Sequence, residues 1–111
     1  MVYFIELWSP TPAWLALSTE ERANYMAQIG PHVQNLIDQG VQILTWSPND
    51  AKTDKRIDFD YFAIWAFPNQ AIADGFQQLV TGAGWYNYFE QVNAMGQAAS
   101  ADSVIGQLIQ L

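Results

Sequence analysis

The residues best able to do chemistry are one carboxylate, one imidazole and a few side-chain amides. Glu6 lies in the apolar segment Val2 to Ser9. In an apolar pocket, desolvation would raise its pKa, and it could then act as a general acid or base near neutral pH. Alternatively, Glu6 belongs to a structural network and hydrogen-bonds Tyr61, Asn93 or an amide of a partner chain. His32, the only histidine, could move a proton or ligate haem iron, or it could be a partly exposed polar residue at a helix edge.

Metal and cofactor sites have little support in the sequence. The single histidine excludes a site of three histidines within one chain, and the absence of cysteine excludes thiolate ligands. No basic residues are placed for the propionates of haem. Asp54, Asp58 and Asp60 lie next to Lys55 and Arg56, and this mixture of charges favours shaping of a hairpin over metal binding. We therefore expect no metal and no cofactor.

Composition and charge limit the class of protein. Half of the 111 residues are hydrophobic and 14% are aromatic, so one domain over residues 1–111 can bury a substantial core. A formal charge of −7 argues against nucleic acid or an anionic membrane surface as a partner, since both require a basic face. The N-terminal segment lacks the basic start and the long apolar run of a signal peptide, and no segment is long enough to span a bilayer. Together with the absence of cysteine, this favours a cytoplasmic protein.

Patterning predicts four strands to carry these side chains. The segments are rich in β-branched and aromatic residues and are bounded by proline, asparagine or glycine. They span residues 2–9, 41–47, 59–67 and 90–97.

Capping signals predict the helices between the strands. Ser18 and Glu21 form a capping box that opens a helix, which Gly40 ends and which we expect to kink or restart at Gly30-Pro31. A second helix begins after Asn69 and stops at residues 82–84. Ser100 could cap a short terminal helix, but the apolar segment after it could equally form a strand.

The order strand, helix, strand, strand, helix, strand predicts an α+β, ferredoxin-like fold. In this fold a four-stranded antiparallel sheet carries both helices on one face. The second face is too aromatic to remain in water, and a second copy of the chain is the simplest cover. We therefore expect a homodimer.

Alternation along the strands predicts which side chains share a face. On one face we place Glu6 together with Leu44, Ala63 and the ligand-binding candidates Phe4, Trp8, Trp46, Tyr61, Trp65, Gln91, Asn93 and Met95. The opposite face is purely apolar and contains Ile5, Leu7, Val41, Ile43, Phe62, Ile64, Val92 and Ala94. Because helices cover apolar surfaces, we assign the second set to the helices and the first set to the uncovered face. A bulge would invert any single strand.

Three segments carry a resemblance to a known family: WLAL at 14–17, FAIWAFP at 62–68 and GWYNYFEQVNAMG at 84–96. They resemble a bacterial family of uncharacterised proteins that is similar to the dimeric α/β-barrel superfamily. That superfamily includes the antibiotic biosynthesis monooxygenases, the muconolactone isomerases and the EthD-like and YCII-like proteins. The resemblance implies two ferredoxin-like units joined face to face, with a cavity on each sheet.

Two functional hypotheses follow. The first is a homodimer with an aromatic-lined cavity for a small apolar or aromatic ligand, acting as a cofactor-independent isomerase or oxygenase in which Glu6 and His32 are the catalytic candidates. The chemistry rests on the resemblance. The alternative is a non-catalytic dimeric binding or interaction module, whose aromatic sheet face only forms the interface. Within 84–96, we expect the aromatic half, Trp85 to Phe89, to be structural and the polar half to line the cavity.

Overall fold

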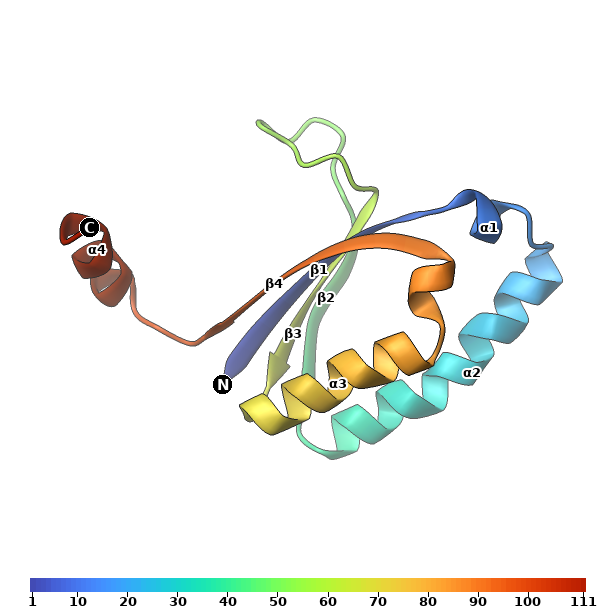
Figure 1. The fold of residues 1–111 in the computed structure, drawn as a ribbon, viewed down its shortest axis with the longest axis horizontal. Coiled ribbons are helices and arrows are strands. Elements are labelled where there is room, and N and C mark those ends of the chain that lie inside the picture. Colours follow the sequence, from blue (N-terminus) through green and yellow to red (C-terminus); the bar gives the residue numbers. More distant parts are fainter.

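The chain folds as a four-stranded antiparallel sheet with two long helices on one face (Figure 1). A computed structural model describes residues 1–111. In chain order the elements are β1 (Val2–Pro10), α1 (Pro12–Leu15), α2 (Thr19–Asp38), β2 (Gln42–Pro48), β3 (Tyr61–Phe67), α3 (Gln70–Gly82), a 3₁₀ turn (Trp85–Asn87), β4 (Phe89–Gln97) and α4 (Ala101–Ile109). The strand order β2-β3-β1-β4 is that of a ferredoxin-like fold, so the predicted fold class is confirmed.

The helices begin where the capping residues predict. Ser18 and Glu21 form the reciprocal capping box of α2, and Asn69 accepts a hydrogen bond from the backbone of Ile72 at the start of α3. Ser100 caps α4 in the same way, so the terminal segment is a helix.

The helix α2 passes through Pro31 without the predicted restart. Gly30 and Pro31 both lie on its exposed side, where water can satisfy the carbonyl that proline leaves without a partner. Gly40 follows the helix with φ of +94°, a left-handed conformation that glycine adopts without strain.

The sequence predicts that the face carrying Glu6 is uncovered, and this prediction is wrong. The two long helices cover that face. Phe4, Trp8 and Trp65 are buried and form one core with Leu36 of α2 and Phe76 of α3. The grouping of side chains from β1, β3 and β4 is correct, because Glu6 pairs with Ala63 on one side and Asn93 on the other. The aromatic side chains of Phe4, Trp8 and Trp65 fill the space between the sheet and the two helices.

A β-bulge in β2 breaks the alternation on which its face assignment depended. The register shifts between Ile43 and Thr45, so Leu44 has no partner on β3. Val41 is buried before the bulge, and Trp46 pairs with Ala63 after it. Val41 and Trp46 therefore both face the helices, although they are five positions apart, and the placement of Leu44 with Trp46 is not retained.

The uncovered face of the sheet is mainly apolar on β3, β1 and β4 and polar on β2, where Gln42, Thr45 and Ser47 belong to it. Its apolar members are Tyr3, Ile5, Leu7, Phe62, Ile64, Val92 and Ala94. Tyr3 is 41%, Ile5 37% and Val92 42% exposed. We call this set the open face. No helix of the chain lies over it, as Figure 1 shows.

The loop between β2 and β3 is a hairpin held by its own polar groups. Arg56 donates through Nε to the carbonyl of Asp50 and through Nη2 to the carbonyl of Phe59. Arg56 also lies 3.9 Å from the carboxylate of Asp58. These contacts agree with a structural role for the charged residues of the loop.

No helix of the chain combines the length and the apolar character needed to cross a membrane.

Candidate functional site

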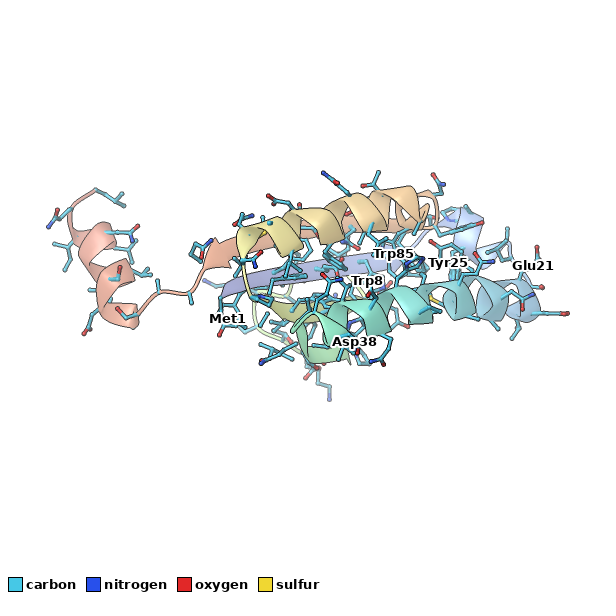
Figure 2. The ribbon with its side chains drawn as sticks, turned by 90° about the horizontal axis from the view of Figure 1, so that it is seen from below. Met1, Trp8, Glu21, Tyr25, Asp38 and Trp85 are labelled. Atoms are coloured by element: carbon cyan, nitrogen blue, oxygen red, sulfur yellow. The ribbon has the colours of Figure 1, made fainter.

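A pocket lies between α2, α3 and the sheet, and both predicted catalytic residues, Glu6 and His32, line it. Figure 2 shows Trp8 and Trp85 in the layer between the two helices and the sheet. The cavity measures about 60 Å³ and is partly open to solvent. Its other lining residues are Ile29, Val33, Leu36, Trp46, Trp65, Phe76, Leu79, Val80, Ala83 and Trp85.

Glu6 is the only charged residue in the buried core, with 5% of its surface exposed. Nε1 of Trp65 donates a hydrogen bond of 2.6 Å to one carboxylate oxygen, and Nε2 of Gln91 donates one of 2.8 Å to the other. Gln91 in turn accepts a hydrogen bond of 2.8 Å from Nε1 of Trp85, and its Nε2 also donates to Oδ1 of Asn93. The predicted direct bonds from Glu6 to Tyr61 or Asn93 do not form.

The two indoles fix the direction of this network. An indole nitrogen can only donate, so Trp85 requires the oxygen of the Gln91 amide and thereby turns its NH₂ group toward Glu6. Trp65 approaches the other oxygen, also as a donor. Both oxygens of Glu6 therefore act as acceptors, and a proton on this carboxyl must occupy a lone pair that neither Trp65 nor Gln91 uses.

Glu6→Gln is expected to change the pH dependence of stability. Burial raises the pKa of Glu6 above its ordinary value of 4.5, although the hydrogen bonds from Gln91 and Trp65 act in the opposite direction. The folded chain then keeps a proton that the unfolded chain has released. The contribution of Glu6 to the free energy of unfolding is therefore greatest below the unfolded pKa and declines as the pH rises through the folded pKa.

This decline should be absent from Glu6→Gln and present in Glu20→Gln, which removes an exposed carboxylate from α2. Urea denaturation at a series of pH values between about 4 and 8 measures the difference. Parallel stability profiles for the two variants would contradict the raised pKa.

His32 contributes from the rim of the pocket. It lies on α2, one turn before Leu36, and is itself exposed while still lining the cavity. Its position at the helix edge agrees with the prediction from the helical repeat. Glu6 at the base and His32 at the rim are therefore the two ionisable side chains that line the pocket.

The predicted ligand-binding residues divide into three groups. Trp46 and Trp65 line the pocket, and Gln91 supports it through its bond to Glu6. Phe4 and Trp8 are buried in the core behind the lining.

The remaining three lie away from the pocket. Tyr61 is 43% exposed and stacks on Trp8, with ring centroids 6.0 Å apart. Asn93 reaches Glu6 only through Gln91, and Met95 is 41% exposed beside Gln70.

Sequence reasoning missed Trp85 and the helix residues of the lining. Trp85 was expected to be structural, and it does pack on Trp8 and Phe89, with ring centroids 5.9 and 4.1 Å apart. It also lines the cavity and orients Gln91. The 3₁₀ turn at Trp85–Asn87 brings Trp85 and Gln91 together, although they are six positions apart in the sequence. Among the helix residues, Ile29 and Val33 recur with Leu36 at helical spacing, a pattern that predicts an apolar stripe on α2 but does not distinguish the wall of a pocket from ordinary packing.

A comparison with a solved structure supports the fold. The chain superimposes on a chlorite dismutase-like protein with a TM-score of 0.73 and 16% identity, over 96% of this chain and 48% of that protein. It therefore spans about half the length of that relative. A second structure is a 5-chloro-2-hydroxyhydroquinone dehydrochlorinase from Burkholderia phenoliruptrix in complex with 2,5-dihydroxybenzoquinone. It matches with a TM-score of 0.49 and 17% identity, over 93% of this chain and 98% of that one.

At 16% identity the likeness to the chlorite dismutase-like protein establishes the ferredoxin-like fold alone. The resemblance to the EthD-like and YCII-like proteins remains a prediction. No curated protein matches the sequence. One family model matches all of residues 1–111, and the chain belongs to this family of unknown function, DUF6616.

Proposed function

We propose that this chain binds a small apolar or aromatic molecule between α2 and α3 and that Glu6 exchanges a proton with a hydroxyl group of that molecule. The observation that carries the proposal is a buried carboxyl at the base of an otherwise apolar, partly open pocket. No lysine or arginine lines the pocket to neutralise it. Such a group retains free lone pairs for a ligand, while the surrounding indoles and aliphatic side chains supply contact area.

The size of the cavity determines how the ligand lies. About 60 Å³ exceeds the volume of one water molecule but is smaller than the cavities of roughly 150 Å³ that bind benzene. The space beside Glu6 therefore accepts the polar end of a ligand. The apolar remainder lies between the half-buried side chains of Ile29, Val33, Leu79 and Val80, which form the outer walls.

The chemistry that follows is general acid and base catalysis. The ionised carboxylate of Glu6 accepts the proton of the ligand hydroxyl, and the protonated form returns a proton to the product. His32 at the rim exchanges that proton with solvent. Removal of a proton from an enol or phenol activates the ring carbons, a first step suited to a cofactor-independent isomerase or oxygenase.

Phenol and toluene test this assignment because they have nearly the same shape and differ in one hydroxyl. The five tryptophans give five indole N–H signals in a ¹⁵N-correlated NMR spectrum. Phenol should shift the signals of Trp65 and Trp85 and should bind roughly two- to tenfold more tightly than toluene, the ratio that one hydrogen bond supplies.

Glu6→Gln should reduce this preference for phenol, and Glu20→Gln should leave it unchanged. Equal binding of phenol and toluene by the unaltered protein would contradict the role of Glu6. The absence of any shift at Trp65 and Trp85 would contradict the pocket itself.

A second candidate function is favoured by the small volume of the cavity. In a non-catalytic dimeric module, Trp65 and Gln91 hold Glu6 only to fix the packing of β1, β3 and β4. This candidate predicts that Glu6→Gln lowers the melting temperature and that neither phenol nor toluene perturbs the indole signals.

The open face supports assembly into a homodimer. Tyr3, Ile5 and Val92 expose apolar side chains in a contiguous sheet, and a second copy of the same face is complementary to it in character. In this assembly the pockets lie on the outer sides of the two sheets, each beneath its own helices.

A further inference from the structure

We infer that α4 is an exchanged arm that packs on the second copy of the chain, in a groove at the edge of the partner's open face. This inference rests on the proposed homodimer and adds the contact that residues 99–111 make within it. The arm is defined here as these thirteen residues, which contain α4 (Ala101–Ile109). Both views show the helix standing apart from the rest of the molecule, beyond the end of β4 (Figures 1 and 2).

The arm has no partner within its own chain. Ala98 makes the last bond to the body, through its N–H to the carbonyl of Met1 at 3.0 Å. The remaining hydrogen bonds of the arm are local, such as those from Val104 and Ser103 to Ser100. A helix of nine residues that contains Gly106 is only marginally stable in water by itself, so packing must supply most of its stability.

The arm presents an apolar stripe that is suited to packing. Val104, Ile105, Leu108 and Ile109 recur at helical spacing and are 47%, 51%, 62% and 77% exposed. Asp102 is the only charged side chain in the helix. This pattern is typical of a helix that buries one side against another surface.

A groove of about 390 Å³ lies beside the root of the arm. Tyr3 and Ile5 of β1, Ala94 and Met95 of β4 and the small residues Ala98 and Ala99 form most of its lining. The chain leaves this groove along an extended segment that carries α4 away from it. Two copies related by a two-fold axis can each place their arm in the groove of the other, which is the reciprocal contact of an isologous dimer.

The dimensions of the chain agree with an exchanged arm. Its accessible surface is 7325 Å², about 1,100 Å² more than a monomer of this mass normally exposes. A standard interface buries about 800 Å² on each partner, so the excess is sufficient for one. The radius of gyration of 16.1 Å likewise exceeds the value of about 13 Å for a compact chain of this length.

Sedimentation of three variants tests the arm separately from the dimer. The unaltered protein should sediment at twice the chain mass of 12.5 kDa at micromolar concentration. Leu108→Asp should weaken dimerisation at least tenfold, since a buried leucine is worth roughly tenfold or more in affinity. Gln107→Asp places the same charge on the polar side of α4 and should have little effect. Ile5→Asp should abolish the dimer.

Equal dimerisation by Leu108→Asp and Gln107→Asp, together with loss of the dimer in Ile5→Asp, would overturn the arm contact and leave the dimer intact. A monomeric unaltered protein would overturn both, while the pocket and its phenol test would be unaffected.

Cross-linking identifies the chain that receives the arm. Because the protein contains no cysteine, Leu108→Cys and Tyr3→Cys can be introduced into separate chains without background. Oxidation of a mixture of the two should give a disulfide-linked pair of chains. An intramolecular disulfide in the double variant without a cross-link in the mixture would show that the arm folds back on its own chain. If neither the cross-link between chains nor the intramolecular disulfide forms, docking in this groove is overturned.

Discussion

Trp65→Ala is expected to lower the free energy of unfolding by about 3–5 kcal/mol, the cost of truncating a large buried aromatic side chain. Only 1% of Trp65 is exposed, and its ring lies 4.8 Å from that of Phe76 and 6.2 Å from that of Phe67. The alanine variant leaves a cavity and also removes the hydrogen bond to Glu6. Typical domains are stable by only about 5–15 kcal/mol, so this one change removes a large share of the total.

Two further variants separate the contributions to that loss. Trp65→Phe keeps one six-membered ring and removes the pyrrole part with its N–H, so it should cost about 1–3 kcal/mol for the unsatisfied carboxylate oxygen, in addition to a smaller cavity than that of the alanine variant. Trp46→Ala affects a neighbouring indole in the same pocket, but Trp46 is 46% exposed, and its loss should cost much less. Urea denaturation measures all three. A cost of less than about 1 kcal/mol for Trp65→Ala would show that α2 collapses into the vacated space.

Gln91→Leu is expected to destabilise the protein by roughly 2–4 kcal/mol, because it leaves two polar groups without partners. Trp85 loses the acceptor for its N–H, and Glu6 loses one of its two donors. Leucine preserves most of the volume, so the loss reports on hydrogen bonding more than on packing. Asn93→Ala is the matched control. Asn93 is exposed at the edge of the same network, and its loss should cost less than about 0.5 kcal/mol.

A double-mutant cycle identifies the source of the Gln91→Leu effect. In a Trp85→Phe background the orphaned N–H no longer exists, so Gln91→Leu should cost about 1 kcal/mol less than in the unaltered protein. Strict additivity would contradict the donor and acceptor order of the network. Thermal or urea unfolding of the four proteins provides the measurement.

Local chemistry made most of the fold predictable from the sequence. Ser18 with Glu21, Asn69 and Ser100 each cap the helix that was assigned to them, because capping depends on residues within one turn. Alternation likewise identified which side chains of β1, β3 and β4 share a face, since the side-chain period of a strand does not depend on its surroundings.

Alternation alone could not predict which face of the sheet the helices cover. The face that contains Glu6 and Gln91 is the one that the helices cover, so the rule that helices cover the purely apolar face chose the wrong side. The helices require bulky residues such as Phe4 and Trp8 beneath them, whereas the flatter set around Ile5 remains exposed in the single chain. The error also hid the pocket. With Glu6 assigned to the uncovered face, Leu79 and Val80 of α3 could not be considered as its neighbours.

The bulge in β2 limits the changes in strand length that this protein can tolerate during evolution. The unpaired Leu44 lets Val41 and Trp46 face the helices together. Regular pairing of the strand at its present length would turn Trp46 outward, so the pocket would lose one wall and the open face would gain an indole. Loss of Leu44 itself would also give regular pairing, but it would leave Trp46 opposite Ala63. The hairpin after Pro48 has no such constraint, because its length does not set the orientation of any lining residue. Insertions and deletions among relatives should therefore accumulate in the hairpin, and the one change of length expected within β2 is loss of the bulged residue.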